Sequence, residues 1–259
     1  MLIILSPAKK QMLTATKENI ATSKINFLKE TQTLVGLLKK YKTQDLQQLM
    51  SISAALAKLN SDRFLEYDLN FNNPSKAAPA VTTFQGDAYK TLNAADFTND
   101  DAIFCQNNMT IISGLYGALN PYDMIQEYRL EMKTNLSNPN GSELYIFWGN
   151  KIANFINNKL KSHDNKTIIN LASVEYSKAI DKKELKHPII NIEFKEKHNG
   201  EYKTIGIYAK KARGLMARFI IKNRITIPFE ITKFNENSYI YSKNLSEENK
   251  FVFVRGQND

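Results

Sequence analysis

The spacing of apolar and polar residues predicts strands and helices that alternate along the whole chain. Apolar runs rich in β-branched and aromatic residues predict strands, and apolar positions that recur every three or four residues predict helices. The predicted strands are residues 2–5, 102–105, 109–112, 167–171, 189–194, 202–208 and 251–254. The predicted helices are residues 26–41, a helical pair across 43–67, a helix that ends at Leu92, 150–161 and 210–224.

The segments between these elements are of two kinds. Residues 68–82 contain Pro74, Pro79 and several asparagines, which predict a loop. Residues 113–149 mix glycine and proline with aromatic residues, so we expect irregular structure packed against the core. No repeat or low-complexity tract interrupts the sequence. The pattern predicts a mixed α/β fold in a single compact domain, residues 1–259, built around a central sheet.

Composition narrows the class of protein. Hydrophobic residues make up 42% of the chain and charged residues 24%, which is ordinary for a globular domain. The sequence contains no run of about 18 apolar residues, so it predicts no membrane span. The first seven residues lack the basic leader and cleavage site of a signal peptide. Cys105 is the single cysteine and lies among apolar neighbours, so we expect a buried core residue in a cytoplasmic protein.

The charge balance favours a polyanionic partner. The net charge is +9, and a basic excess attracts nucleic acid. Because a sequence rich in Lys, Asn and Ile together can gain lysines from AT-rich codons, clustering is more informative than the total. Residues 203–224 contain no acidic residue and seven basic ones: Lys203, Lys210, Lys211, Arg213, Arg218, Lys222 and Arg224.

Helical spacing places Lys211, Arg218 and Lys222 on one face of the helix predicted at 210–224. We expect this face to be exposed and, together with Lys210 and Arg213, to contact DNA phosphates. A solvated face on a basic protein is the alternative.

A second candidate contact is the segment 46–57, which resembles the turn of a helix-hairpin-helix motif. In that motif a Gly-hydrophobic-Gly turn lets the start of the second helix bind a DNA phosphate. Ser51 and Ser53 take the places of the two glycines, and Ser53 is expected to cap the second helix. A plain helical hairpin is the alternative.

Polar residues also follow several predicted strand ends and glycine turns. Parallel strands end at the same edge of a sheet, where α/β proteins place their ligand sites. We expect a basic cleft at this edge, with Lys210 and Arg213 delivered by the strand predicted at 202–208. The candidate cleft residues are Lys9, Asp87, Tyr89, Arg129, Glu131, Glu175, Lys210 and Arg213. Separate local ion pairs, such as one between Arg129 and Glu131, are the alternative.

Other kinds of site have no support in the sequence. The glycine-rich phosphate loops G-x-G-x-x-G and G-x-x-x-x-G-K-[ST] are absent. The three histidines lack the spacing of metal ligands. We therefore expect neither a metal nor a cofactor.

Seven short motifs, taken together and in order, resemble the bacterial YaaA family of peroxide-stress resistance proteins over nearly the full chain. The motifs are Leu5-Ser-Pro-Ala-Lys9, Phe84-Gln-Gly-Asp-Ala-Tyr89, Ser113-Gly-Leu-Tyr-Gly-Ala-Leu119, Tyr128-Arg-Leu-Glu-Met132, Phe147-Trp-Gly149, Asn170-Leu-Ala-Ser173 and Tyr208-Ala-Lys-Lys-Ala-Arg-Gly-Leu-Met216. The resemblance implies a cytoplasmic protein that helps cells survive hydrogen peroxide by limiting intracellular iron. It also implies binding of duplex and branched DNA, a helix-hairpin-helix element near 43–67, a positively charged cleft and an unusual α/β fold. No reaction is attached to the family.

Three hypotheses follow. The first is a DNA-binding stress protein with little sequence preference, with a monomer favoured. The second is an enzyme that acts on a nucleic-acid base or nucleotide. It would use Lys9 or Lys210 as nucleophile or phosphate clamp, and Tyr89 for stacking or proton transfer. Its acid or base would be Asp87, Glu131 or Glu175. The third, direct iron binding, has the least support because histidine and cysteine are scarce.

Overall fold

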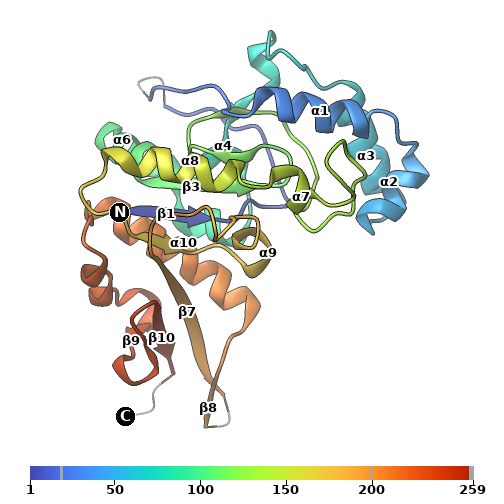
Figure 1. Ribbon diagram of the computed structural model, residues 1–259. Helices are drawn as coiled ribbons and strands as arrows, with labels where there is room; N and C mark the ends of the chain where they lie inside the picture. The colour runs from blue at the N-terminus through green and yellow to red at the C-terminus, as the bar shows by residue number, and fades with distance from the viewer. Residues whose placement is uncertain (18–19, 199, 257–259) are drawn as a thin grey trace.

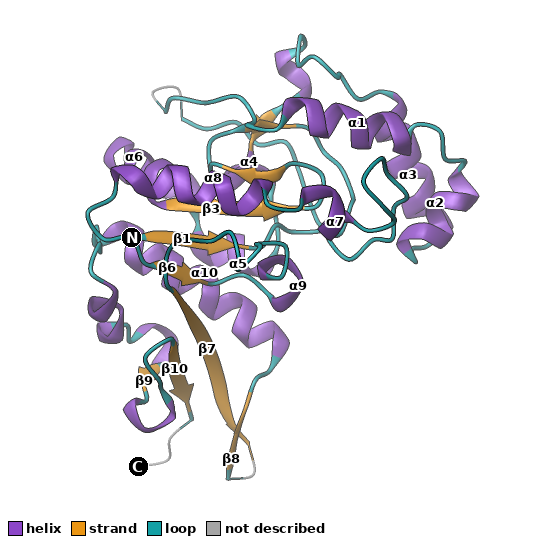
Figure 2. Cartoon of the chain, in the orientation of Figure 1, coloured by secondary structure: helices purple, strands orange, loops and turns teal. Residues whose placement is uncertain are grey.

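Five parallel strands form the middle of an eight-stranded sheet in the computed structural model, which describes residues 1–17, 20–198 and 200–256 (Figures 1 and 2). The parallel strands are β1 (Leu2–Leu5), β3 (Met109–Ser113), β6 (Ile168–Asn170), β7 (Ile189–His198) and β10 (Lys250–Arg255). Three antiparallel strands join them: β4 (Gly117–Leu119), β8 (Glu201–Lys203) and β9 (Ile240–Tyr241). A separate ribbon pairs β2 (Ala78–Pro79) with β5 (Met124–Ile125).

The strand order fixes where a ligand site can form. The sheet runs β4-β3-β1-β6-β7-β10-β9, with β8 paired to β7. The chain therefore leaves β1 for β3 on one side and later returns to β6 on the other side. Such a reversal opens a crevice at the carboxyl ends of the two strands where the order switches, which are β1 and β6 here.

Helices cover both faces of the sheet. The helix α8 is drawn in front of the sheet in Figure 1 and α10 behind it. Contacts join α8 to β4, α6 to β1 and β3, and α10 to β7. The helices are α1 (Leu28–Leu38), α2 (Thr43–Met50), α3 (Ala54–Leu65), α4 (Ala80–Thr83), α5 (Asp87–Leu92), α6 (Asn99–Asn108), α7 (Leu144–Trp148), α8 (Lys151–Lys159), α9 (Val174–Ser177) and α10 (Gly206–Lys222).

The core follows the apolar pattern of the sequence. Every residue of β1 is buried, as a strand between two others and under helices requires. Trp148 is fully buried, and its indole N–H donates to the carbonyl of Gly114 at 3.0 Å. Cys105 is buried as expected, and burial raises the pKa of its thiol. Among the described residues, no helix is long and apolar enough to cross a membrane.

The helical pair predicted across 43–67 is confirmed as α2 and α3, and the strands predicted at 2–5, 109–112 and 251–254 are confirmed. The strand predicted at 102–105 is wrong, because this run lies in α6. The hydroxyl of Thr98 and the carboxylate of Asp101 form a reciprocal capping box that starts this helix.

The strand predicted at 202–208 is also wrong. Only β8 is extended, as the antiparallel partner of β7, and α10 begins at Gly206. Ile207 and Tyr208, at the end of this run, lie on the first turn of α10 and are exposed. Packing of α10 on α5 overrides the local strand preference.

Lys159 ties the end of α8 to two neighbouring elements. Its ammonium group donates to the carbonyls of Gln106 and Met109 at 2.8 and 2.7 Å, and to the side-chain oxygen of Asn120 at 2.6 Å. Burial lowers the pKa of Lys159 to about 7, and the nearby Asp123 carboxylate offsets only part of this effect.

We predict that replacing Lys159 changes how stability depends on pH. The pKa of Lys159 in the folded protein lies below its ordinary value of 10.5. Between about pH 7 and 10 the unfolded chain therefore holds a proton that the folded chain has lost, so the free energy of unfolding rises with pH. Urea unfolding at pH 7 and 9 should show that the free energy of unfolding rises with pH for the parent and rises less for Lys159→Met. Lys161→Met, at an exposed neighbour, should behave like the parent. Equal profiles for the parent and Lys159→Met would show that Lys159 keeps an ordinary pKa.

Candidate functional site

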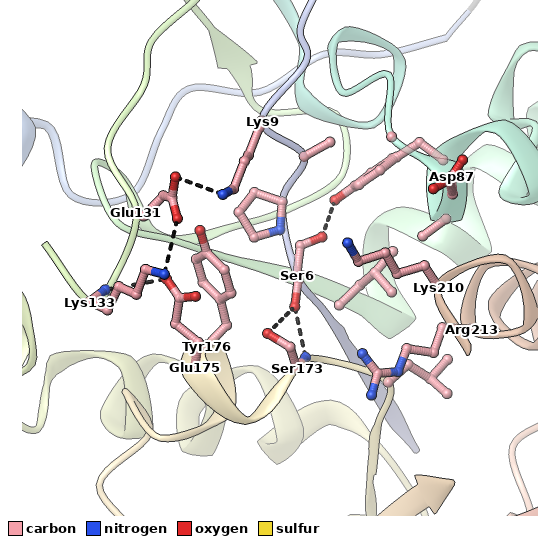
Figure 3. A pocket seen from close by; sticks show the side chains of 17 residues that line it. Ser6, Lys9, Asp87, Glu131, Lys133, Ser173, Glu175, Tyr176, Lys210 and Arg213 are labelled. Carbon is pink, nitrogen blue, oxygen red and sulfur yellow. Dashed lines mark hydrogen bonds and ion pairs between the residues drawn. The ribbon is translucent and has the colours of Figure 1, made fainter. Parts of the chain in front are cut away.

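A cavity of about 430 Å³ lies where β1 and β6 end, at the place that the strand order predicts (Figure 3). Its wall is built from the segments that follow these two strands, the start of α5, the first turns of α10 and the segment around Glu131. The basic side chains that line it are Lys9, Lys133, Lys210 and Arg213, and the acidic ones are Asp87, Glu131 and Glu175. The lining is therefore mixed in charge, with basic and acidic side chains from the expected set of cleft residues and an excess of one basic side chain.

Two serines join the strand ends beneath the cavity. The hydroxyl of Ser6 accepts a hydrogen bond from the backbone N–H of Ser173 at 2.8 Å and donates one to the Ser173 hydroxyl at 3.3 Å. This link lies directly beyond the parallel pairing of β1 with β6. It fixes the relative positions of the two segments that carry Lys9 and Glu175.

Tyr89 supports this junction. Its hydroxyl donates to the carbonyl of Ser6 at 2.8 Å, and its ring is buried against Phe84 with the ring centroids 5.1 Å apart. Burial raises the pKa of Tyr89 well above its ordinary value. Tyr89 lines the cavity, with its ring packed on Phe84 and its hydroxyl bonded to Ser6. Its expected role in stacking on a base or transferring a proton stays a prediction.

Glu131 is the centre of an ion-pair network on one wall. Its carboxylate lies 2.9 Å from the ammonium of Lys9, 3.1 Å from the guanidinium of Arg129 and 3.8 Å from the ammonium of Lys133. The backbone N–H of Lys133 donates to Glu175 at 3.3 Å. Arg129 is outside the cavity lining, so the structural ion pair expected as its alternative role is the one observed.

The helices α5 and α10 form the opposite wall because Gly214 lets them approach closely. A Cβ at this position would lie 2.0 Å from the carbonyl oxygen of Ala88, so any larger residue would force the helices apart. The Thr91 hydroxyl also donates to the carbonyl of Lys211 at 2.8 Å. This contact places Lys210 and Arg213 beside α5, a role that we had expected a third strand to play.

Asp87, Lys210 and Arg213 on this wall form no ion pair with any residue in the described parts of the chain. The Nε atom of Arg213 is buried and has no hydrogen-bond partner there. Burial lowers the pKa of Arg213. The expected convergence is confirmed for Lys9, Asp87, Lys210 and Arg213, whose charged ends share one cavity (Figure 3).

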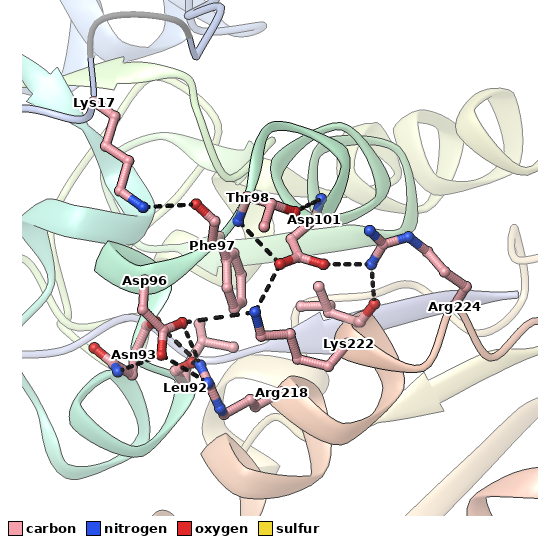
Figure 4. A network of polar contacts seen from close by, with 11 residues as sticks. Lys17, Leu92, Asn93, Asp96, Phe97, Thr98, Asp101, Arg218, Lys222 and Arg224 are labelled. Atoms are coloured by element: carbon pink, nitrogen blue, oxygen red, sulfur yellow. Dashed lines mark hydrogen bonds and ion pairs between the residues drawn. The ribbon is translucent and has the colours of Figure 1, made fainter.

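The other basic residues of α10 and the following turn behave differently (Figure 4). Arg218 makes two hydrogen bonds of 2.7 Å to Asp96, and Lys222 and Arg224 bind Asp101 at 2.7 and 2.6 Å. The side chains of Arg218 and Lys222 are only 26% and 33% exposed. The acid-free run of the sequence meets its acids in space, which corrects the expectation that these two residues form a free, exposed face.

Asp101 is the buried centre of this second network. Burial opposes its ionisation, but hydrogen bonds from Lys222, the backbone of Thr98 and Arg224 outweigh that cost and hold the pKa of Asp101 well below its ordinary value. Asp101 is 4% exposed, so its carboxylate has little access to water as an alternative partner. This network fastens α10 to α6.

The turn between α2 and α3 carries the two serines that take the places of the motif's glycines. Ser51 ends α2 in the left-handed conformation with φ of 50°, a region that glycine adopts most easily. Ser53 caps α3 as expected, with its hydroxyl accepting from the backbone N–H of Leu56 at 3.4 Å. Ser51 and Ser53 are exposed. Figure 1 places this hairpin on the side of the molecule towards which β1 points.

Lys133 is the charged cavity residue that sequence reasoning missed. It lies two positions after Glu131 in a segment without regular secondary structure. Met132 and Lys133 lie in a turn in which the backbone N–H of Thr134 donates to the carbonyl of Glu131 at 3.0 Å, so no strand or helix periodicity could have indicated Lys133. Across the described ranges, no group of three or more His, Cys, Asp or Glu side chains could hold a metal ion.

Comparison with known proteins now gives the site a context. The family model described as "Peroxide stress protein YaaA" matches residues 1–245. The chain belongs to the YaaA family. A "UPF0246 protein" of Saccharophagus degradans is 43% identical over 257 residues, which cover 99% of this chain and 100% of the relative. Another "UPF0246 protein", from Legionella pneumophila (strain Corby), is 42% identical over 255 residues, 98% of this chain and 99% of the relative. The resemblance to the YaaA family seen in the seven motifs is confirmed.

We predict that Asp101→Asn destabilises this YaaA-family protein by about 1–3 kcal/mol near neutral pH, because Lys222 and Arg224 lose a charged, buried acceptor. The pKa of Asp101 is depressed in the folded state, so its contribution is present above about pH 4 to 5 and is lost as the pH falls further. Urea unfolding should show a difference between parent and variant that shrinks in acid. Asp100→Asn, at an exposed position in the same helical turn, is the matched control. Equal unfolding midpoints for Asp101→Asn and Asp100→Asn would contradict the structural role of this network.

Proposed function

We propose that this chain is a cytoplasmic peroxide-stress protein that binds double-stranded or branched DNA with little sequence preference. By this binding it would help to limit DNA damage and intracellular iron. The membership in the YaaA family supports the link to peroxide stress. The observation that supports an anionic partner is the wall of the cavity on which Lys210 and Arg213 have no acidic partner among the described residues.

The charge pattern of α10 assigns different tasks to its basic residues in this proposal. Arg218 holds α10 to Asp96, and Lys222 holds it to Asp101 of α6, so these two residues are not the main phosphate contacts. Lys210 is exposed and Arg213 reaches into the cavity, which makes these two the preferred contacts. Lys211 is half-buried outside the cavity lining and would act only through its long-range charge.

The α2–α3 hairpin supports a second phosphate contact. Its exposed turn is followed by Ala54 and Ala55, whose small side chains leave the start of α3 accessible. The first backbone N–H groups of a helix have no partner within the helix and attract anions. Ser53 uses one of these groups, that of Leu56, as its own capping partner, so the groups of Ala54 and Ala55 would be the ones offered to DNA.

We predict that affinity for a mixed-sequence duplex falls steeply as salt increases, because phosphate contacts release counterions. Fluorescence anisotropy between about 50 and 200 mM salt would measure the slope of log affinity against log salt. Lys210→Ala should weaken binding and reduce this slope by about one unit. Lys243→Ala, at an exposed lysine on the turn after β9, should match the parent. Affinity that stays flat with salt would refute an electrostatic contact with DNA.

Asp87 favours a second candidate function, an enzyme that acts on a nucleotide or a nucleic-acid base. Its carboxylate lines the same cavity as Lys210 and Arg213 and forms no ion pair within the described ranges. An acid or base must be free to exchange a proton with its substrate, and the carboxylate of Glu131 is instead held by cations.

This second candidate predicts turnover that depends on Asp87. Nucleotides and oligonucleotides would be incubated with the parent and with Asp87→Asn, and the products separated by chromatography. Asp100→Asn serves as the control for a changed surface charge. Products formed equally by the parent and Asp87→Asn would exclude Asp87 as the acid or base, and no product from the parent with either substrate class would exclude this function.

A further inference from the structure

The two walls of the cavity differ in how their charges are compensated. On one wall, Lys9 and Lys133 share the carboxylate of Glu131, which is 12% exposed. On the other wall, Lys210 and Arg213 have only Asp87 near them, without an ion pair within 4.0 Å among the described residues. Excess positive charge therefore gathers at the α10 side of the cavity.

Arg213 is the clearest case on this wall of a cation without an anionic partner. Its Nε atom is buried without a hydrogen-bond acceptor, and the side chain forms no ion pair in the described part of the chain. A desolvated cation without a partner lowers the stability of the folded protein. Elsewhere α10 meets this need with Asp96 and Asp101. An anion bound in the cavity would give the guanidinium the charged partner that it lacks, although the Nε atom itself is closed off from the cavity. A planar guanidinium suits the oxygens of a phosphate.

The size of the cavity limits the ligand. A volume of about 430 Å³ falls within the range of about 300–1,000 Å³ typical of small-molecule pockets. A stacked base pair inside a duplex cannot enter such a space, whereas a single nucleotide outside the stack can. The cavity also offers apolar surface for a base or sugar, from Pro7, Ala8, Ala88 and Tyr176.

We infer that this cavity binds one unstacked nucleotide, with its phosphate held between Lys210 and Arg213 and its base or sugar against the segments that follow β1 and β6. The inference deepens the proposed DNA binding and, for a nucleotide within a strand, rests on it. The ligand is either a free nucleoside monophosphate or an extrahelical nucleotide of a DNA strand. These two sources share the phosphate chemistry and are separated by the experiment.

The experiment compares two labelled DNA duplexes that differ only by one unpaired, bulged nucleotide. The parent should bind the bulged duplex about tenfold more tightly than the plain one. Arg213→Gln should lose this preference, because it removes the charge that faces the phosphate. Lys90→Gln, at an exposed lysine of α5 outside the cavity lining, should keep it. Titration of the parent and Arg213→Gln with a free deoxynucleoside monophosphate and with inorganic phosphate tests the free ligand.

The outcomes separate this inference from DNA binding itself. Equal binding of both duplexes by the parent, with no binding of the free nucleotide, would overturn the inference and leave DNA binding standing. Binding of the free nucleotide that depends on Arg213, without binding of either duplex, would support the cavity and overturn the DNA proposal. If inorganic phosphate binds as tightly as the nucleotide, the assignment of a nucleotide as the ligand is overturned and only an anion site remains.

A stability measurement guards against loss of binding through misfolding. Because the Nε atom of Arg213 is buried without a hydrogen-bond partner and the side chain forms no ion pair in the described part of the chain, Arg213→Gln should have a thermal unfolding temperature equal to or above that of the parent. A nucleotide at saturating concentration should raise the unfolding temperature of the parent and leave that of Arg213→Gln unchanged. A lower unfolding temperature for the variant without ligand would show that Arg213 stabilises the fold, and would overturn its assignment as an anion ligand.

Discussion

The position of β1 between β3 and β6 is the constraint on which the candidate site depends. β1 is buried on both faces and hydrogen-bonded along both edges, so its register leaves no freedom at its carboxyl end. Ser6 follows at once and meets Ser173, which follows β6. Two chain segments diverge from this point, one carrying Lys9 and the other Glu175. These residues are therefore placed by the rigid sheet and not by flexible loops.

A second constraint, the close approach of α5 and α10 at Gly214, completes the site. The sheet alone supplies only the wall with Lys9 and Glu175. Gly214 allows α10 to pack against Ala88, and this contact carries Lys210 and Arg213 to the cavity from a distant part of the sequence. The Asp101 network then holds the far end of the same helix. The helix is thus fixed at two points, while Lys210 and Arg213 in its first turns form no ion pair with the described residues.

The parts of the fold that follow from sequence are those that local chemistry determines. The buried runs of β1 and β3 and the capped hairpin at Ser53 could be predicted because one periodicity or one cap accounts for each. The run 102–105 was misassigned because its apolar residues fit a strand, while the capping box at Thr98 that starts α6 precedes it. The run 202–208 was misassigned because Ile207 and Tyr208, which favour a strand, are exposed on the first turn of a helix that distant packing holds in place.

The site was partly predictable for the same reason. Strand ends on one edge of a sheet can be inferred from order and polarity, so the meeting of the segments that carry Lys9 and Glu175 was within reach. Lys210 reaches the same cavity by a route that was not predicted, because α10 carries it and not a strand. The pairing of the basic residues of α10 with acids could not be predicted. Asp96 and Asp101 lie more than one hundred positions before the basic residues that they bind. A run of basic residues therefore does not by itself indicate a surface for nucleic acid. Only those cations that the fold leaves without an acid, as it leaves Arg213 among the described residues, retain unused capacity to bind an anion.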